Sequence, residues 1–140
     1  MEANNAVLQA TRARAHPRCI VCSSANPLGL GMECTLLADG AVQGSFKCGH
    51  IFEGYNGILH GGVIAALLDS AMTQCLFAHG RQGLTAELKV RYRHGVTIEE
   101  PMTVRAWIKH SANRYHVLQA ELHQKDCAKA IATAKFMESL

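Results

Sequence analysis

The segment Tyr55–Gly80, YNGILHGGVIAALLDSAMTQCLFAHG, decides the fold of this 140-residue chain. From about Gly61 to His79 it is apolar around nearly its whole circumference, which predicts a helix enclosed by other elements. This helix contains one carboxylate, Asp69, and neither lysine nor arginine. Burying an unpaired carboxylate is costly, so such a group changes its pKa or acquires partners. Asp69 is therefore the first candidate for a functional residue.

Strand patterns flank this helix on both sides. Before it, MECTLLADGAVQGSFKC predicts two strands joined at Asp39-Gly40, a strong signal for a two-residue hairpin turn. After it, LTAELKVRYR alternates with period two, which predicts a half-buried antiparallel strand. The expected buried face comprises Leu84, Ala86, Leu88, Val90 and Tyr92, and the expected polar face comprises Thr85, Glu87, Lys89, Arg91 and Arg93.

The order of elements predicts an α+β fold. Three more strands, MTVRAWIK, YHVLQAELHQ and CAKAIATAKFM, complete a pattern of two strands, one helix and four strands of curved antiparallel sheet. Residues 1–18 are expected to form an arm or short helix, and residues 19–140 a single domain. Small inward residues leave room for the helix beneath the sheet, namely Ala106, Ala120, Ala128, Ala130, Ala132 and Ala134.

Composition limits the classes of function. The formal net charge of +3 is too weak to indicate a nucleic-acid partner. The first fifteen residues contain no apolar core of signal-peptide length. The apolar run Val63–Ala78 is too short for a membrane span and is interrupted by polar residues. We therefore expect a cytoplasmic protein without a membrane span and without nucleic acid.

Six cysteines without a secretory signal predict free thiols in a reducing compartment. The stretch HPRCIVC contains a CxxC motif, Cys19 and Cys22, with His16 close by, and CGH at Cys48 to His50 offers further ligands. A zinc site needs a second, well-spaced ligand pair, and the chain has one CxxC only. The sequence therefore predicts loop or core cysteines, no metal and no cofactor.

Three stretches carry a resemblance to a known family. HGG at residues 60–62, with an acid nine residues after the histidine, resembles hotdog-fold acyl-CoA thioesterases, most nearly the phenylacetate-pathway and 4-hydroxybenzoyl-CoA thioesterase branch. CIVCSSANPLGL and TAELKVRYRHGV are similar to one bacterial subgroup, and the likeness runs from Cys19 to the C-terminus. It implies a curved antiparallel sheet wrapped around one long central helix. It also implies hydrolysis of an acyl-CoA thioester at a subunit interface.

The helix start and its acid suit that chemistry. A helix that begins at Gly61 exposes unpaired N–H groups and the positive end of the helix dipole, and glycine lets an oxygen approach closely. The resemblance implies that the Gly61 N–H polarises the thioester carbonyl and that Asp69 acts as base or nucleophile. Partial desolvation would raise the pKa of Asp69. The competing explanation for Gly61 and Gly62 is tight packing of the helix start, and for Asp69 it is a structural acid that caps a loop or pairs with arginine.

The spacing of His60 and Asp69 predicts a homodimer. Nine residues place them on opposite sides of the helix and about 13 Å apart along its axis. They cannot act on one thioester within one chain, so two helices must lie side by side. The resemblance implies the same, with the glycine N–H and the acid from different chains. Whether dimers pair into a tetramer stays open.

The remaining candidates each have a competing explanation. The resemblance implies that His60 orients the substrate carbonyl or the loop, and the competing explanation is that its ring caps a backbone group. Asn56 lies near Gly54, where some relatives carry asparagine. The resemblance also implies that Thr85 lies near the water or the acyl group, and the competing explanation is solvent exposure. The phosphates of coenzyme A would meet a basic set, which otherwise is a solvated sheet edge: Arg93, His94, Lys109 and Arg114.

Two questions about function stay open at this stage. The alternative to an enzyme is a non-catalytic hotdog protein that binds acyl-CoA or lipid as a sensor or carrier. The acyl group is undefined, because the candidate pocket residues suit an aryl or a fatty-acyl chain and several suit a plain core: Phe46, Phe52, Tyr55, Met72, Phe77 and Trp107.

Overall fold

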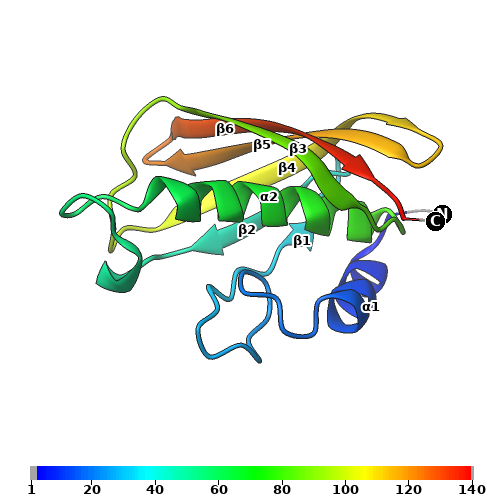
Figure 1. Ribbon diagram of the computed structural model, residues 1–140, viewed down its shortest axis with the longest axis horizontal. Coiled ribbons are helices and arrows are strands. Elements are labelled where there is room, and N and C mark those ends of the chain that lie inside the picture. Colours follow the sequence, from blue (N-terminus) through cyan, green and yellow to red (C-terminus); the bar gives the residue numbers. More distant parts are fainter. Residues whose placement is uncertain (1–2, 140) are drawn as a thin grey trace.

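The computed structural model describes residues 3–139, so residues 1, 2 and 140 of the two predicted ranges lie outside the described residues. One long helix lies against one sheet (Figure 1). In chain order the elements are α1 (Asn5–Ala15), β1 (Thr35–Leu36), β2 (Val42–Phe46), the short 3-10 helix η1 (His50–Phe52), α2 (Gly61–Ala78), β3 (Leu84–Tyr92), β4 (Met102–Ala112), β5 (Tyr115–Gln124) and β6 (Cys127–Met137).

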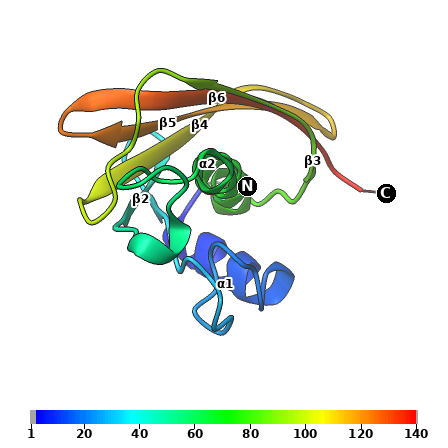
Figure 2. The same ribbon diagram turned by 60° about the vertical axis from the view of Figure 1, so that its left-hand side comes forward.

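The six strands form a single antiparallel sheet in the order β1-β2-β4-β5-β6-β3. Figure 2 shows the sheet arching over α2, with α1 and the loops that follow it on the other side of the helix. The predicted α+β class and the hotdog arrangement, a curved sheet around one long central helix, are confirmed.

Small inward residues let the sheet approach the helix, as predicted. Five of the six alanines are buried, but Ala128 is partly exposed. The pairing of β5 with β6 shifts between Leu122 and His123, so that Ala130 and Ala128 are the successive partners. Because of this register shift, Ala128 does not continue the inward-facing alternation of Ala130, Ala132 and Ala134. The prediction that Ala128 faces inward is therefore wrong.

The β1–β2 hairpin is present, but its turn is longer than predicted. The Leu37 N–H donates to the Ala41 carbonyl at 2.7 Å, and the Gly40 N–H donates to the Leu37 carbonyl at 3.1 Å. Gly40 has a φ of +89°, which glycine adopts without strain. These features define a three-residue loop closed by a left-handed glycine, so the two-residue turn was wrong.

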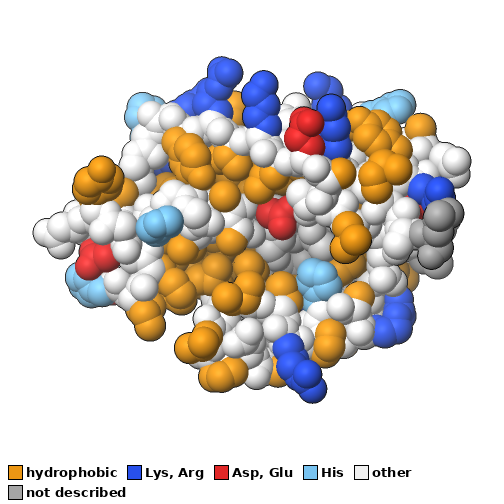
Figure 3. Space-filling model, in the orientation of Figure 1, with side chains coloured by type: hydrophobic (Ala, Val, Ile, Leu, Met, Phe, Trp, Pro, Cys, Tyr) orange, Lys and Arg blue, Asp and Glu red, His pale blue; other side chains and the backbone are white. Residues whose placement is uncertain are grey.

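One side of α2 is not enclosed by its own chain. All nine residues from Ser70 to Ala78 are buried, but the first half of the helix leaves Gly62 exposed and Ala65, Ala66 and Asp69 partly exposed. Hydrophobic side chains cover much of this face (Figure 3). By length and hydropathy α2 resembles a membrane span, but 67% of it is buried inside the protein, which fits a core helix.

Strand β3 forms the outer edge of the sheet next to this uncovered side. The prediction that it is half-buried is wrong for the single chain, because every residue of β3 except Val90 is exposed. Leu84 and Tyr92 are 73% and 51% exposed. An exposed, unpaired edge of this kind is a template for association with another chain.

A buried amide joins α2 to the N-terminal part of the chain. Gln74 is fully buried, and its side-chain oxygen accepts from the Cys34 N–H at 2.8 Å and from Arg12 at 3.0 Å. Its amide nitrogen donates to the Met32 carbonyl and to Ser70. All four hydrogen-bonding positions of the side chain are therefore occupied, as a buried polar group requires.

Candidate active site

Asp69 lies on the uncovered side of α2, in the third turn of the helix. Its Oδ1 accepts a hydrogen bond from the Thr85 hydroxyl at 2.7 Å. Desolvation raises the pKa of Asp69 above its usual value, while the Thr85 hydrogen bond and the charge of His16 act in the opposite direction. The predicted direction of the shift is confirmed. Asp69 is therefore a carboxylate with one defined partner and a partly desolvated environment.

A β-bulge explains why Thr85 reaches Asp69. Thr85 pairs with Phe136 and Glu87 pairs with the next residue of β6, Lys135, which leaves Ala86 as the extra residue. Because Phe136 is fully buried on the helix side of the sheet, Thr85 also turns to that side. Simple alternation had placed Thr85 with Glu87 on the polar face, so that prediction is wrong.

The hydroxyl of Thr73, one helical turn after Asp69, does not bond to the Asp69 carboxylate. The Thr73 hydroxyl instead donates to the backbone carbonyl of Asp69 at 3.1 Å. Threonine commonly forms such a bond to the preceding turn, which leaves the carboxylate oxygens to groups from other elements.

At the start of α2, one N–H group has no partner within the part of the chain that the structure describes. His60 caps the helix, because its Nδ1 accepts from the Gly62 N–H at 2.8 Å. The Val63 and Ile64 N–H groups donate to the His60 carbonyl. Among residues 3–139, no acceptor for the Gly61 N–H is recorded. Gly61 therefore keeps a donor at the positive end of the helix dipole, whereas Gly62 uses its N–H internally.

The cap also determines which ring nitrogen of His60 is a donor. Since Nδ1 accepts the Gly62 hydrogen bond, the proton of a neutral ring is assigned to Nε2. The capping role that competed with substrate orientation is thus present. It does not prevent the second nitrogen from donating to a ligand.

Tyr92 is a component of the site that sequence reasoning missed. Its hydroxyl donates to the Gly61 carbonyl at 2.7 Å, and its ring lies 3.6 Å from the position a Gly61 Cβ would take. Strand β3 thus contacts α2 at both candidate positions, through Thr85 at Asp69 and through Tyr92 at Gly61. Period-two alternation predicted the inward face for Tyr92 but carried no signal for this bond.

A hollow of about 330 Å³ opens at the helix start. It is lined by Gly54, Tyr55, Leu59, His60 and Gly61. A Cβ at position 54 would lie 3.3 Å from the His60 Cα and 3.4 Å from its Cδ2, so a larger residue there would press on the histidine. The hollow is therefore suited to a ligand that approaches the free N–H of Gly61. The predicted Asn56 is exposed in the adjoining turn and is not part of this lining.

Within a single chain, the four basic candidate residues do not lie close together. Arg93 and His94 are exposed after β3, and their N–H groups donate to the Lys129 carbonyl. Figure 1 places this end of β3 near the start of α2, whereas the β4–β5 hairpin with Lys109 and Arg114 lies at the opposite end of the sheet. Within a single chain, the two pairs face different ends of the helix.

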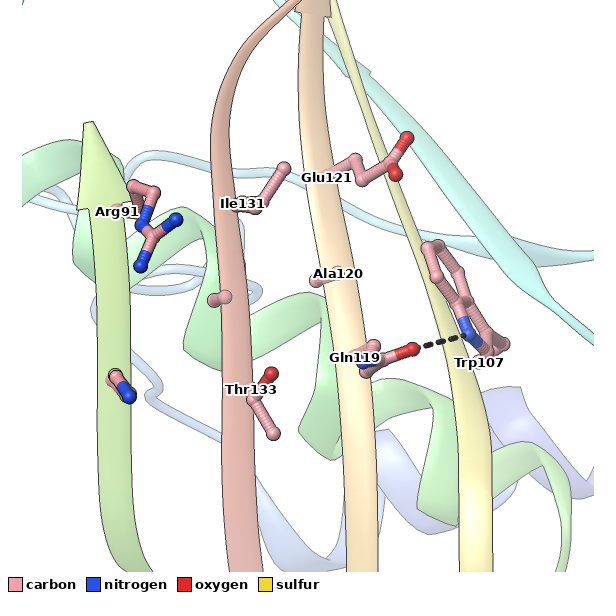
Figure 4. A pocket seen from close by; sticks show the side chains of 9 residues that line it. Arg91, Trp107, Gln119, Ala120, Glu121, Ile131 and Thr133 are labelled. Atoms are coloured by element: carbon pink, nitrogen blue, oxygen red, sulfur yellow. Dashed lines mark hydrogen bonds between the residues drawn. The ribbon is translucent and has the colours of Figure 1, made fainter. Parts of the chain in front are cut away.

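The aromatic and apolar candidates also separate. Met72 and Phe77 belong to the core, and Tyr55 is 88% exposed beside the hollow. Trp107 lies on the outer face of the sheet, in a separate hollow of about 230 Å³ that also contains Arg91 and Thr133 (Figure 4). Its indole N–H donates to Gln119 across the neighbouring strand. Of these residues, Tyr55 alone borders the hollow at Gly61.

A family model described as the thioesterase superfamily matches residues 56–131, which is more than half of the chain. A search of curated proteins gave no sequence match. Among solved structures, a thioesterase superfamily protein is 26% identical with a TM-score of 0.80, covering 84% of this chain and 61% of its own. The present chain thus spans less than two thirds of that relative.

Two further structures cover more of their own length. A conserved protein of Pseudomonas aeruginosa is 26% identical, with a TM-score of 0.74 and coverage of 89% of this chain and 99% of its own. A hypothetical thioesterase of Streptococcus pneumoniae TIGR4, solved with coenzyme A, is 20% identical, with a TM-score of 0.72 and coverage of 77% and 88%. Phenylacetic acid degradation proteins occur among the other matches.

Proposed function

Because the chain belongs to the thioesterase superfamily, we propose that it hydrolyses an acyl-CoA thioester to the free acid and coenzyme A. The related streptococcal fold solved with coenzyme A supports this class of substrate. The observation that carries the proposal is the pairing of Asp69 with Thr85 on the uncovered side of α2, on the same helix as the free Gly61 N–H.

The two functional groups act from different subunits in this proposal. Asp69 and Gly61 are eight residues apart on one helix, a separation of about 12 Å along the axis. Two copies with antiparallel α2 helices would bring Asp69 of one subunit to Gly61 of the partner subunit. The small residues on the uncovered side of α2 allow close approach, and the neighbouring apolar surface supplies area to bury: Leu84, Leu88, Tyr92 and Met137.

A dimer would also bring the basic candidate residues close together. Antiparallel helices bring the Arg93 and His94 end of one subunit toward the Lys109 and Arg114 end of its partner. Such a rim offers several cations to the phosphates of coenzyme A. The acyl group would enter the hollow beside Tyr55.

The proposed reaction needs one general base, Asp69, and one hydrogen-bond donor to the developing oxyanion, the Gly61 N–H. Asp69 removes a proton from water, and the resulting hydroxide attacks the thioester carbonyl carbon. The oxygen that becomes negative is held by the Gly61 N–H at the helix start, with the His60 Nε2–H close by. Collapse of the tetrahedral intermediate breaks the C–S bond, and the departing thiolate takes the proton from Asp69.

A nucleophilic role for Asp69 is a distinct route to the same products. The carboxylate would attack the carbonyl carbon, expel the thiolate and form a mixed anhydride, which water then hydrolyses. A single turnover in ¹⁸O-labelled water separates the two routes. Label in the Asp69 carboxylate identifies the anhydride route with water attacking the Asp69 carbonyl carbon. Label in the product acid alone identifies the general-base route only if hydroxylamine also traps no acyl group from Asp69, because water can attack the acyl carbon of the anhydride too.

The proposed activity is tested with a panel of aryl- and fatty-acyl-CoAs and a colorimetric assay of free thiol. We expect at least one substrate with kcat/KM of about 10⁴ M⁻¹s⁻¹ or more. Absence of thiol release across the panel would contradict the enzyme assignment. If acyl-CoA bound tightly under the same conditions, the non-catalytic binding protein would be favoured instead.

A further inference from the structure

Three soft donor groups converge in the loop that follows α1. The ligand atoms of His16, Cys19 and Cys22 all lie within 4.8 Å of one another. They come from one short segment with the spacing His-x-x-Cys-x-x-Cys. Sequence reasoning expected no metal because a second CxxC is lacking. The structure shows that the histidine takes part in the cluster with the cysteine pair.

The distances within the cluster match those of a tetrahedral metal site. Zinc binds cysteine sulfur at about 2.3 Å and histidine nitrogen at about 2.0–2.1 Å, so two such ligands at a tetrahedral angle are about 3.6 Å apart. The Cys22 Sγ and the His16 Nδ1 are 3.6 Å apart. The cluster therefore needs little rearrangement to accept the ion.

The loop also prepares the first sulfur as a ligand. The Val21 and Cys22 N–H groups both point at the Cys19 Sγ, each at 3.4 Å. Backbone donors of this kind fix the direction of the sulfur. They come from the two residues that close the CxxC turn, so the turn itself holds the sulfur in place.

The surrounding backbone is rigidly tied, which lowers the entropic cost of binding. Leu30 donates to the Ile20 carbonyl at 2.7 Å, and Met32 donates to the Val21 carbonyl at 2.8 Å. A Cβ on Gly29 would lie 3.0 Å from two carbonyl oxygens of the same loop, so the chain is closely wound there. These bonds hold the CxxC turn against the rest of the protein in the absence of any side-chain bridge between Cys19 and Cys22, both of which are free.

We propose that His16, Cys19 and Cys22 bind one zinc(II) ion, with a water molecule as the fourth ligand. The water would occupy the adjoining hollow of about 300 Å³, which His16 and Cys22 line together with Glu33. The negative charges of two thiolates balance the two positive charges of the zinc ion. Arg12 is another residue that lines this hollow.

A bound ion would connect the loop that contains Cys19 and Cys22 to the central helix α2 through His16. The ring of His16 makes an edge contact with Phe77 of α2, with centroids 5.0 Å apart. Zinc would link this histidine to the cysteines of the loop and so join α1, the loop and α2. Because a structural ion contributes its binding free energy to folding, its removal should lower stability.

The test measures metal in the full-length protein expressed with zinc and purified without chelator. We expect about one zinc per chain by mass spectrometry of the metals. The Cys19→Ser/Cys22→Ser double variant and His16→Ala should lose most of it. The matched controls Cys127→Ser and His110→Ala alter residues outside the cluster and should keep the wild-type content.

Replacement by cobalt(II) gives a readout that does not depend on how the variants fold. Wild-type protein should show the sulfur-to-cobalt charge-transfer band and the intense visible bands of a tetrahedral site. Chelation should lower the thermal midpoint of wild type by several degrees, an effect absent from the double variant. Wild type that binds no zinc and gives no thiolate band with cobalt would overturn the proposal, as would full zinc content in a well-folded double variant.

Discussion

At the scale of single residues, the carboxylate of Asp69 is tuned by two opposing effects. Burial raises its pKa, and the Thr85 hydroxyl lowers it again by stabilising the ionised form. The residue is thus partly desolvated and yet fixed in one orientation by a 2.7 Å hydrogen bond. A positioned base with a raised pKa is suited to proton transfer near neutral pH.

The first prediction concerns the acid itself. Asp69→Asn keeps the side-chain volume and the Thr85 contact but removes the base, so thioester hydrolysis should fall at least about a hundredfold. The thiol-release assay measures the loss, and the dimer should survive by size-exclusion chromatography. Asp126→Asn, in the exposed turn between β5 and β6, is the control and should leave activity unchanged. A fully active Asp69→Asn protein would remove Asp69 from the mechanism.

The second prediction concerns the partner of the acid. In the proposed mechanism Asp69 must be ionised to act, so activity is expected to decline as pH falls through the pKa of Asp69. Thr85→Val removes the hydrogen bond that lowers this pKa, and the acidic limb of the kcat/KM profile should move to higher pH. Thr85→Ser keeps the hydroxyl and should keep the limb near its wild-type position.

The control for the Thr85 experiment is a threonine that lies away from Asp69. Thr133→Val changes a threonine on the outer face of the sheet and should leave the profile where it was. An unchanged acidic limb in Thr85→Val would show that the hydroxyl does not act on the catalytic ionisation.

At the scale of elements, β3 and α2 together build the site. Strand β3 contributes Thr85 at Asp69 and Tyr92 at Gly61, and the bulge at Ala86 turns Thr85 toward the helix. A bulge changes which side chains face inward without changing the composition of the strand. The same element is an edge of the sheet, so its exposed surface lies beside the residues that it positions.

The third prediction concerns how α2 is held to the N-terminal part of the chain. Gln74→Ala leaves the buried Cys34 N–H, the Met32 carbonyl and Arg12 without their amide partner. The free energy of unfolding should fall by about 2–3 kcal/mol. Chemical denaturation measures the change. Gln82→Ala, an exposed glutamine in the α2–β3 loop, should change it by less than about 0.5 kcal/mol. Equal stability of the two variants would contradict the role of the buried amide.

At the scale of the whole molecule, the proposed site is divided between two chains. The fourth prediction uses two variants that are inactive alone. Gly61→Pro removes the N–H donor at a helix position that tolerates proline, and Asp69→Asn removes the base. Each homodimer lacks one component in both of its sites. A heterodimer has one site with both changes and one with neither.

Mixing the two variants should therefore restore activity. Random exchange makes half of the dimers mixed, each with one intact site of two, so recovery should reach roughly a quarter of the wild-type rate. Native mass spectrometry verifies the heterodimer, and circular dichroism verifies that each variant is folded. Well-folded heterodimers without any recovery would place the complete site within one chain.

Sequence patterns alone were enough to predict the class of fold and the main candidate residues. The order of two strands, one helix and four strands follows from the local spacing of apolar residues. The bounds of α2 were predicted to within one residue. The raised pKa of Asp69 was also predicted, because a lone acid in an apolar helix must lose solvent wherever the helix packs.

Only the tertiary structure decided which residues meet. The bulge that turns Thr85 to Asp69, the Tyr92 bond to Gly61 and the approach of His16 to the CxxC turn all join segments that alternation and composition describe separately. The physical reason is that periodicity reports which side of an element is apolar. Strand register, bulges and loop closure arise from contacts between distant parts of the chain, and these contacts set the direction of individual polar side chains.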